Sequence, residues 1–448
     1  MNQINKYYFI GIGGIGMSSI ARFLLAKGQH VAGYDKTPSD LITDLCKLGA
    51  VVTFGETTND IPEGFENEQV KVIYTPAIPA SHPQLTHFKS QSNSVVKRAV
   101  FLGELTLDTY TLAVAGTHGK TTTTSILAHL FSSLSQSFTA FVGGILKGHD
   151  TNMLSTGTDF SLVEADEFDR SFLQLKPTIG CITSVDADHL DIYGSADEVY
   201  KSYSQFASQV ITHLIVEKQV PIKGITYSIS DSKADYHTTN IKTEGFGYRF
   251  NLHTPKNEFV DIYFSQLGLH NLSNAIAAFA MADKSGLDNN KLLNALGSFP
   301  GVARRLELVV ESKEHILIDD YAHHPTEIKA VYDTLEDAFP KEKKCVIFQP
   351  HLYSRTSDFM DDFARSLSLF ERVILIPIYP ARERPIEGIN SKVLADKIGS
   401  HSMVSLVEKI NLVDEVSAAP ERIKIVLGAG DIGLEVQKLK NKLLGNAD

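Results

Sequence analysis

The chain has 448 residues, and at roughly 150 residues per domain this length predicts three domains. Hydrophobic residues make up 43% of the chain and charged residues 21%, a globular composition that argues against long disordered or collagen-like stretches. Acidic residues outnumber basic ones by 53 to 42, which gives a formal net charge of -11. We therefore expect no nucleic-acid partner, because sequence-independent binding of that kind needs a basic surface.

The cysteines and the apolar runs indicate the compartment. The three cysteines, Cys46, Cys181 and Cys345, share no Cys-x-x-Cys spacing, and an odd, scattered set fits a reducing cytoplasm. No apolar run approaches the roughly 18 residues of a membrane helix, so we expect no membrane insertion. The segment from Tyr7 to Met17 resembles a short signal peptide, but its glycine spacing indicates a turn instead. For the oligomeric state we expect a monomer or a weak homodimer.

Apolar β-rich runs alternate with helical patterns along the chain, which predicts the α/β fold class with parallel sheets. The first region, residues 1–108, is predicted to be a Rossmann-like domain. Its predicted strands cover residues 7–12, 30–34, 51–54 and 70–74, and its predicted helices end near residue 27 and cover residues 41–48 and 98–107.

The second region, residues 109–300, is predicted to be a P-loop ATPase-like domain of mixed α/β structure. Its predicted elements are strand 112–115, helix 120–134, strands 160–164 and 179–183, β-hairpins near 235–265, and helices 271–284 and 289–296. A break at Phe299-Pro300-Gly301 precedes a Rossmann-like C-terminal α/β domain, residues 301–448. The predicted strands of that domain cover residues 315–318, 345–348, 373–377 and 423–427.

The strongest functional signal is a glycine-rich loop between a predicted strand and a predicted helix. It consists of Gly116, Thr117, His118, Gly119, Lys120, Thr121 and Thr122. Glycines let backbone N–H groups approach phosphate oxygens, and the helix N-terminus adds the positive end of its dipole. In this pattern Lys120 reaches the β- and γ-phosphates and Thr121 holds Mg²⁺. The match to a P-loop is incomplete because Val114 stands where the first glycine belongs, and the alternative is a plain strand–helix turn.

A second glycine-rich turn follows the first predicted strand. It consists of Gly11, Ile12, Gly13, Gly14, Ile15 and Gly16, which fits the spacing Gly-x-Gly-x-x-Gly. Asp35 follows Gly16 by 19 residues, at the end of the second strand, where an acidic residue binds a ribose hydroxyl. NAD and a UDP-sugar both place a diphosphate on such a turn, so the pattern leaves both open, beside a tight turn without ligand.

Carboxylates and a histidine follow the next two predicted strands of the second region. Glu164 ends one strand, where a second Mg²⁺ ligand belongs, and Asp166 or Glu167 suits a helix cap. His189 lies among carboxylates after the next strand, where it would ligate the metal or orient phosphate. The alternatives are an acidic helix N-terminus and a histidine that binds nothing.

Polar clusters continue to the end of the chain. Asn271 and Asn274 are spaced to lie on one helix face, where they suit either an adenine edge or a helix cap. In the third region Arg304-Arg305 precedes a strand, and residues 319–325 and 349–356 each follow one. Open α/β sheets build binding sites at consecutive strand ends in this way, although any single cluster could be a solvated loop.

Together these motifs resemble the Mur ligases, the ATP-dependent amide-forming enzymes of peptidoglycan precursor synthesis. The resemblance covers the chain in order through GIGGIGMS, AGTHGKTTTT, EADEFDRSF, DADHLDIYG, HNLSNA, ARRLE, DDYAHHPTE and QPHLYSRT. It implies a first domain for the UDP of UDP-N-acetylmuramate, a second for ATP and Mg²⁺ (with Mn²⁺ as the alternative ion) and a third for an amino acid. Within the family, the chain looks like the members that use L-alanine: the lactyl carboxylate takes the γ-phosphate of ATP, and the alanine amine then displaces phosphate from the acyl phosphate.

The resemblance also implies roles for single residues. Lys120 contacts the ATP phosphates, Glu164 and His189 serve Mg²⁺ with Thr121, and Asn271 and Asn274 lie near the adenine. The remaining assignments are Arg305 to the phosphates on domain closure, Asp320 near the nucleotide, Tyr321, His323, His351 and Arg355 around the alanine, and Thr75 in the UDP-sugar site. Arg355 is expected on the alanine carboxylate and His323 as the acceptor of the amine proton.

One departure and three rival functions accompany this interpretation. Relatives often carry arginine where this chain has Leu352, so the alanine carboxylate has fewer cationic partners here. The close rival is a recycling ligase that adds L-Ala-γ-D-Glu-meso-diaminopimelate to UDP-N-acetylmuramate, and the segment QPHLYSRT with Arg355 favours the alanine enzyme over it. An NAD-dependent oxidoreductase would leave the phosphate loop and Glu164 unexplained, and a non-catalytic ATP-gated module would not need both Lys120 and Glu164.

Overall fold

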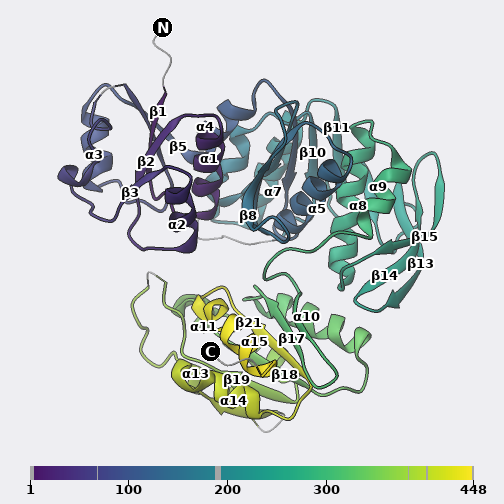
Figure 1. Ribbon diagram of the computed structural model, residues 1–448. Helices are drawn as coiled ribbons and strands as arrows, with labels where there is room; N and C mark the ends of the chain where they lie inside the picture. Colours follow the sequence, from purple (N-terminus) through teal and green to yellow (C-terminus); the bar gives the residue numbers. More distant parts are fainter. Residues whose placement is uncertain (1–4, 68, 187–192, 382, 400–401, 446–448) are drawn as a thin grey trace. The chain divides into compact units, whose positions relative to one another are not determined.

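The computed structural model of the protein describes residues 5–67, 69–186, 193–381, 383–399 and 402–445 (Figure 1). The chain divides into two compact units. The first comprises residues 1–241, 249–264 and 270–300, and the second comprises residues 242–248, 265–269 and 301–448. The predicted division of the first unit at residue 108 stays a prediction. No helix in the described part of the chain is long and apolar enough to cross a bilayer.

The N-terminal sheet of the first unit is parallel, with the strand order β3-β2-β1-β4-β5. Residues 8–10 of β1 are fully buried, as expected for a parallel strand covered on both faces. Because β2 and β4 flank β1 on opposite sides, the turn after β1 lies at the switch point of the sheet, where α/β folds bind ligands. The elements are β1 (Lys6–Ile10), α1 (Ile15–Ala26), β2 (His30–Tyr34), α2 (Asp40–Lys47), β3 (Val51–Thr53), β4 (Val70–Tyr74), α3 (Pro83–Ser90), β5 (Ser94–Lys97) and α4 (Arg98–Thr106), with a short 3₁₀ turn at Thr58–Asp60.

The first unit also contains a ten-stranded sheet with the order β15-β14-β13-β12-β11-β10-β6-β9-β7-β8. Strand β6 lies between β10 and β9 and is parallel to both, so the loops after these three strands meet at one edge. The elements are β6 (Tyr110–Ala115), α5 (Lys120–Ser133), β7 (Phe138–Leu146), β8 (Thr151–Ser155), β9 (Phe160–Glu164), a 3₁₀ segment (Phe168–Gln174), β10 (Ile179–Ile182), α7 (Ala196–Gln209), β11 (His213–Glu217), β12 (Ile225–Ser228), β13 (Tyr236–Glu244), β14 (Gly247–His253), β15 (Glu258–Phe264), α8 (Leu269–Lys284) and α9 (Asn289–Leu296).

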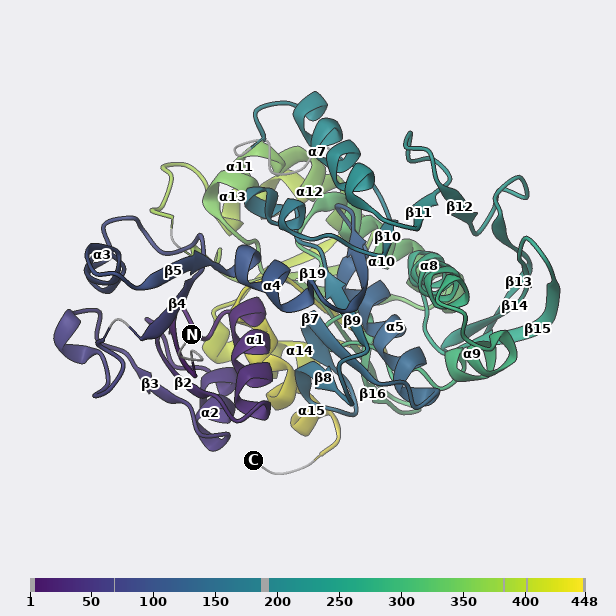
Figure 2. The same cartoon turned by 90° about the horizontal axis from the view of Figure 1, so that it is seen from above.

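The two sheets of the first unit share one hydrophobic core. Phe9 and Met17 of the N-terminal sheet region belong to the same buried cluster as Phe141 and Val163 of the ten-stranded sheet. Helix α1 packs on β7 and β8, and both views show α1 beside β8 (Figures 1 and 2). The glycine-rich turn before α1 is therefore fixed relative to the ten-stranded sheet.

The second unit contains a six-stranded sheet with the order β16-β17-β21-β18-β19-β20, in which β16 alone is antiparallel to its neighbour. Strands β17, β21 and β18 are adjacent and buried, so their C-terminal loops form one edge. The elements are β16 (Glu307–Glu311), β17 (Ile316–Asp320), α10 (Pro325–Ala338), β18 (Lys344–Phe348), α11 (Tyr353–Asp358), α12 (Met360–Leu367), β19 (Arg372–Leu375), α13 (Ser391–Ile398), β20 (Met403–Leu406), α14 (Leu412–Ala418), β21 (Ile423–Leu427) and α15 (Val436–Leu443), with 3₁₀ turns at Lys409–Asn411 and Asp431–Glu435.

The α/β prediction is confirmed, and several predicted elements match closely. Strands β9 and β21 and helix α9 have the predicted bounds, and the predicted hairpins near 235–265 are β13, β14 and β15. The pattern missed β5, β7, β8, β11, β12, β20, α3 and α7. Strand β7 was missed because Gly143 and Gly144 interrupt its apolar run, although β8 still pairs with it antiparallel around an irregularity.

Candidate active site

The predicted phosphate loop lies between β6 and α5, as the sequence indicates. Gly116 has φ +139° and Gly119 has φ +83°, values that L side chains rarely adopt. A Cβ atom on Gly116 would lie 2.0 Å from Oγ1 of Thr183, and one on Gly119 would lie 2.3 Å from Oδ1 of Asn274. Both glycines are therefore required by backbone conformation and by close packing.

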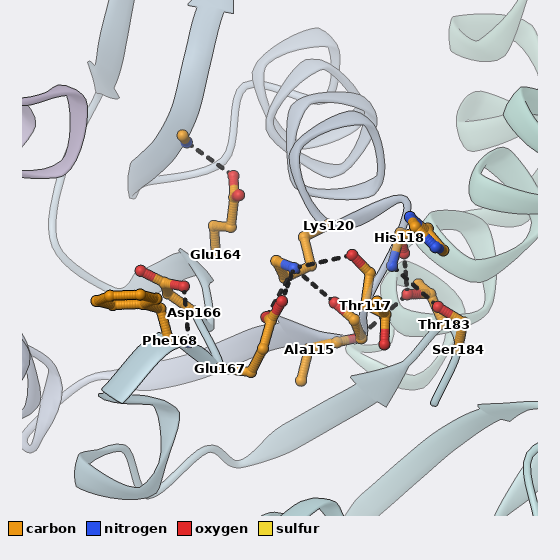
Figure 3. A network of polar contacts seen from close by, with 12 residues as sticks. Ala115, Thr117, His118, Lys120, Glu164, Asp166, Glu167, Phe168, Thr183 and Ser184 are labelled. Carbon is orange, nitrogen blue, oxygen red and sulfur yellow. Dashed lines mark hydrogen bonds and ion pairs between the residues drawn. The ribbon is translucent and has the colours of Figure 1, made fainter. Parts of the chain in front are cut away.

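Thr183 and Ser184, which directly follow the neighbouring strand β10, hydrogen-bond to this loop. The Ser184 hydroxyl accepts from the His118 N–H at 2.9 Å, and the Ser184 carbonyl accepts from the Thr117 N–H at 3.2 Å (Figure 3). Thr183 donates its hydroxyl to the His118 carbonyl. The sequence reasoning missed both residues, and their signal was a Thr-Ser pair directly after a buried strand.

Lys120 is the first residue of α5, and its ammonium group turns back onto the loop. Its Nζ donates to the carbonyls of Gly116 at 2.6 Å and Thr117 at 3.2 Å, and it forms an ion pair with Oε2 of Glu167 at 2.7 Å (Figure 3). The exposed fractions of the Lys120 and Glu167 side chains are 13% and 7%. Burial raises the pKa of Glu167, and the Lys120 ammonium opposes that shift. Glu167 was predicted only as a cap, whereas it pairs with the phosphate-loop lysine.

Thr121, in the first turn of α5, faces Glu164, the last residue of β9. The Thr121 hydroxyl donates to Oε1 of Glu164 at 2.9 Å, and the Gly143 N–H donates to Oε2 at 2.7 Å. An adjacent hydroxyl and carboxylate are the hard oxygen donors that Mg²⁺ prefers. The third predicted ligand, His189, lies outside the described residues. Within the described residues no cluster of three or more His, Cys, Asp or Glu side chains is placed to hold a metal.

The two predicted adenine-site asparagines lie in the first turns of α8. Both are buried, and the helix begins at Leu269, so neither Asn271 nor Asn274 is the residue that precedes the helix. Asn274 packs against Gly119 and joins α8 to the phosphate loop.

The other glycine-rich turn is held by Asp35 and by the strand below it. The N–H groups of Gly11 and Ile12 donate to the Tyr34 carbonyl at 2.8 and 3.0 Å, and the Gly13 N–H donates to Oδ2 of Asp35 at 2.8 Å. One carboxylate oxygen of Asp35 thus fixes the turn itself.

The rest of this turn opens helix α1. Gly14 is the cap of α1, and Gly14 and Ile15 are exposed at its N-terminus, where backbone N–H groups have no partner within the helix. Gly11 has φ +89°, and a Cβ there would lie 2.7 Å from Cγ2 of Thr75. Thr75 therefore packs directly on the turn. This position is compatible with the prediction that Thr75 belongs to the UDP-sugar site.

The four residues predicted around the amino acid gather at the C-terminal edge of the six-stranded sheet. Tyr321 and His323 follow β17, and their ring centroids lie 5.4 Å apart. His351 follows β18, and its ring centroid lies 6.1 Å from that of His323. Arg355, in α11, directs Nη1 at Nδ1 of His351 over 3.2 Å. Leu352, the departure from the family pattern, has φ +70° and donates its N–H to the Tyr379 carbonyl at 2.9 Å.

The two histidines of this cluster are neutral at neutral pH. Burial lowers the pKa of His323, and burial with the charge of Arg355 lowers the pKa of His351 to about 4. Nδ1 of His323 lies 2.9 Å from the Tyr321 carbonyl, which only accepts, so Nδ1 carries the proton. Nε2 of His323 then keeps its lone pair and can accept a proton.

Arg305 and Asp320 lie beside the same cluster. The Arg305 guanidinium lies 5.3 Å from the centroid of the Tyr321 ring. Asp320 is buried, and its two carboxylate oxygens accept the N–H groups of Leu306 and Ala322, each at 2.7 Å. Burial raises the pKa of Asp320 to about 6. Asp320 thus organises the loops on either side of it, a role that the sequence pattern did not reveal.

A phosphate loop with a carboxylate facing its threonine, on a chain with a second diphosphate-type turn, is typical of an enzyme that binds a nucleoside triphosphate. Three family descriptions match consecutive parts of the chain: "Mur ligase family, catalytic domain" over residues 6–110, "Mur ligase middle domain" over 114–282, and "Mur ligase, glutamate ligase domain" over 304–434. The chain belongs to the Mur ligase family.

Relatives and solved structures agree with this assignment over the whole length. The chain is 46% identical to a UDP-N-acetylmuramate–L-alanine ligase of Flavobacterium johnsoniae, covering 100% of this chain and 99% of the relative. It is 47% identical to the enzyme of that name from Christiangramia forsetii, again covering 100% and 99%. The crystal structure of a UDP-N-acetylmuramate–alanine ligase from Thermotoga maritima matches with a TM-score of 0.85 at 26% identity, covering 98% of this chain and 99% of that chain. A murein peptide ligase from Psychrobacter arcticus shares the fold, with a TM-score of 0.70 at 21% identity and coverage of 99% of each chain.

Proposed function

We propose that the protein joins L-alanine to the lactyl carboxylate of UDP-N-acetylmuramate and converts ATP to ADP and phosphate. The observation that carries this proposal is the identity of 46% to 47%, over the whole chain, with relatives that bear the name of this reaction. The recycling ligase is less favoured, because the murein peptide ligase above is only 21% identical.

In the first step, a lactyl carboxylate oxygen attacks the γ-phosphorus of ATP, and ADP leaves. We assign Lys120, the N–H groups of residues 116–122 and Arg305 to the ATP phosphates, and Asn271 and Asn274 to the adenine. The direct contacts of Lys120 with the loop carbonyls support its assignment, because they place the ammonium where the loop would hold phosphate. Little covalent chemistry is left to the protein, so position and fixed charge dominate.

In the second step, the alanine amine attacks the acyl carbon, the tetrahedral intermediate forms, and phosphate leaves. We assign Arg355 to the alanine carboxylate and His323 to the amine proton, with Tyr321 and His351 lining the site. Two observations support the role of His323: its pKa is lowered by burial, and its Nδ1–H is committed to the Tyr321 carbonyl. A neutral imidazole with a free Nε2 lone pair is what a proton acceptor needs.

We assign Mg²⁺ to Thr121, Glu164 and His189, where the ion would neutralise negative charge on the phosphate oxygens. The oxygen pair of Thr121 and Glu164, 2.9 Å apart, supports this choice of ion. We place the protein in the cytoplasm, because ATP is consumed there and because Cys46, Cys181 and Cys345 are free thiols. For its oligomeric state, we propose a monomer or a weak homodimer.

Phosphate release from ATP tests the proposal. The protein is incubated with Mg²⁺, ATP and UDP-N-acetylmuramate, and either L-alanine or L-Ala-γ-D-Glu-meso-diaminopimelate is added. Phosphate release with alanine, and a product mass equal to the UDP-sugar plus alanine less water, is the expected result. Release with the tripeptide alone would transfer the protein to the recycling reaction.

A further inference from the structure

Arg98, the first residue of α4, lies beside the glycine-rich turn of the N-terminal sheet. An ideal Cβ atom on Gly16 would lie 2.7 Å from Nη1 of Arg98 and 3.2 Å from its Cζ. Gly16 is in the first turn of α1, so the guanidinium packs on the end of the helix where N–H groups point outward. A glycine at this position leaves room for the arginine.

A carboxylate from the other sheet of the first unit holds Arg98 in this place. Nη2 of Arg98 lies 2.9 Å from Oδ2 of Asp166. Oδ1 of Asp166 accepts the Phe168 N–H at 3.1 Å (Figure 3). The Arg98 side chain is only 15% exposed. Asp166 is therefore fixed by the backbone, and one edge of the guanidinium is fixed by Asp166.

The helix end beside Arg98 is itself anchored. The side-chain amide of Asn152, which is fully buried in β8, donates to the Ile15 carbonyl at 2.6 Å and to the Ser18 hydroxyl at 2.8 Å. The position of the guanidinium relative to the turn is thus set by three elements, and it does not depend on one mobile side chain.

We propose that Arg98 binds the diphosphate of the UDP-sugar, and that Asp166 is the residue that positions it. This inference rests on the proposed function and names the cation of its UDP-sugar site. The turn itself, residues 11–16, carries no lysine or arginine, so a cation that neutralises the two negative charges of the diphosphate must come from another segment. A guanidinium has five N–H donors and binds phosphate oxygens in pairs, so one edge can stay on Asp166 while the Nη1 edge serves the ligand.

The alternative is a purely structural ion pair, and the chain offers a matched control for it. Lys97, the preceding residue, forms an ion pair with Asp169 at 2.7 Å, and so joins the same two segments as Arg98 and Asp166. Removing either cation deletes one such link, but of these two cations it is Arg98 that packs on Gly16.

Calorimetric binding of UDP-N-acetylmuramate and of free UDP to Arg98→Ala and Lys97→Ala tests the inference. Arg98→Ala should weaken both ligands about tenfold or more, the usual loss for a hydrogen-bonded charge, while Lys97→Ala should leave both unchanged. In steady-state assays Arg98→Ala should raise the KM for the UDP-sugar, with little change in kcat or in the KM for ATP.

Two further variants keep the test decisive if Arg98→Ala unfolds. Arg98→Lys retains the charge without the paired donors, and Asp166→Asn retains the arginine but loosens it; each should weaken UDP binding by less than Arg98→Ala. Equal losses in Arg98→Ala and Lys97→Ala, or no loss in either, would overturn the inference. If the unmodified protein bound neither UDP nor UDP-N-acetylmuramate, the proposed function itself would fail instead.

Discussion

The phosphate loop and the amino-acid cluster handle buried charge in opposite ways. In the phosphate loop, a buried ammonium is paired with a buried carboxylate, Lys120 with Glu167 at 2.7 Å. In the amino-acid cluster, the cation of Arg355 points at an imidazole nitrogen of His351, and both histidines are kept neutral. Both places lie at the C-terminal ends of parallel strands, so the difference is one of side-chain chemistry and not of fold.

The difference matches what each half of the proposed reaction requires. A transferring phosphoryl group needs fixed positive charge, and a paired carboxylate keeps a lysine ionised even when it is buried. An incoming amine needs a base, and a neighbouring cation together with burial keeps histidine unprotonated. Substituting one residue of the Lys120–Glu167 pair or of the Arg355–His351 pair at a time tests whether the two sites act in these different ways.

The largest effect is expected from Lys120→Ala. Loss of the ammonium should lower phosphate release on the order of 10³-fold, because the developing phosphate charge loses its nearest fixed cation. Binding of UDP-N-acetylmuramate should be unchanged in calorimetry. Equal losses of UDP-sugar binding and phosphate release would contradict the separate roles of the two glycine-rich loops.

The same substitution leaves Glu167 buried without its partner, which is costly in itself, typically about 3–5 kcal/mol for a broken buried pair. The double variant Lys120→Ala/Glu167→Gln removes that charge as well. Its thermal stability should recover relative to Lys120→Ala, while its phosphate release stays low. Recovery of activity along with stability would show that Lys120 is structural.

A smaller effect is expected from Arg355→Ala. The KM for alanine should rise roughly 10- to 100-fold, the loss of a charge-assisted hydrogen bond to a carboxylate, and the KM for ATP should hardly change. The pKa of His351 should rise toward its ordinary value, because Arg355 is one cause of its being lowered to about 4. An NMR titration of His351 follows this shift, and a larger rise in the ATP KM than in the alanine KM would place Arg355 elsewhere.

The last effect concerns stability and not activity: like Glu167, Asp319 in the second unit is a buried carboxyl beside a cation. It lies 3.4 Å from Nε of Arg304, yet burial raises its pKa to about 7. Between about pH 4 and pH 7 the folded carboxyl keeps its proton while the unfolded one ionises, so its contribution to stability is lost as the pH rises. The slope approaches about 1.4 kcal/mol per pH unit.

Asp319→Asn should flatten this dependence. Thermal unfolding of both proteins at pH 5 and pH 7.5 measures the change, and the unsubstituted protein should lose more stability between the two values. A constant difference between the proteins at both pH values would mean that the pKa of Asp319 is not raised in the folded state.

Local patterns predicted much of the fold and the main elements of the site. Glycine spacing located both phosphate-type turns, and the strand-end positions of Glu164, His323 and His351 follow from apolar runs with polar ends. These signals are contained within some ten residues, so a single sequence reveals them.

The residues that were missed act across long separations. Glu167 pairs with a lysine 47 positions earlier, and Arg98 reaches an aspartate 68 positions later. Nothing in the local pattern around Arg98 distinguishes it from an ordinary surface arginine at a helix start. Such pairs become visible once the strand order brings their segments together, and strand order is a long-range property.

The most direct test asks whether phosphoryl transfer and amino-acid binding use separate sites, and it does so by trapping the acyl phosphate. The protein, ATP, Mg²⁺ and UDP-N-acetylmuramate are mixed with hydroxylamine in the absence of alanine, and the UDP-sugar hydroxamate is measured by mass. The hydroxamate should form with the unsubstituted protein and with Arg355→Ala, and not with Lys120→Ala. A hydroxamate that requires Arg355 as strictly as Lys120, or that never forms without alanine, would contradict separate sites for phosphoryl transfer and for the amino acid.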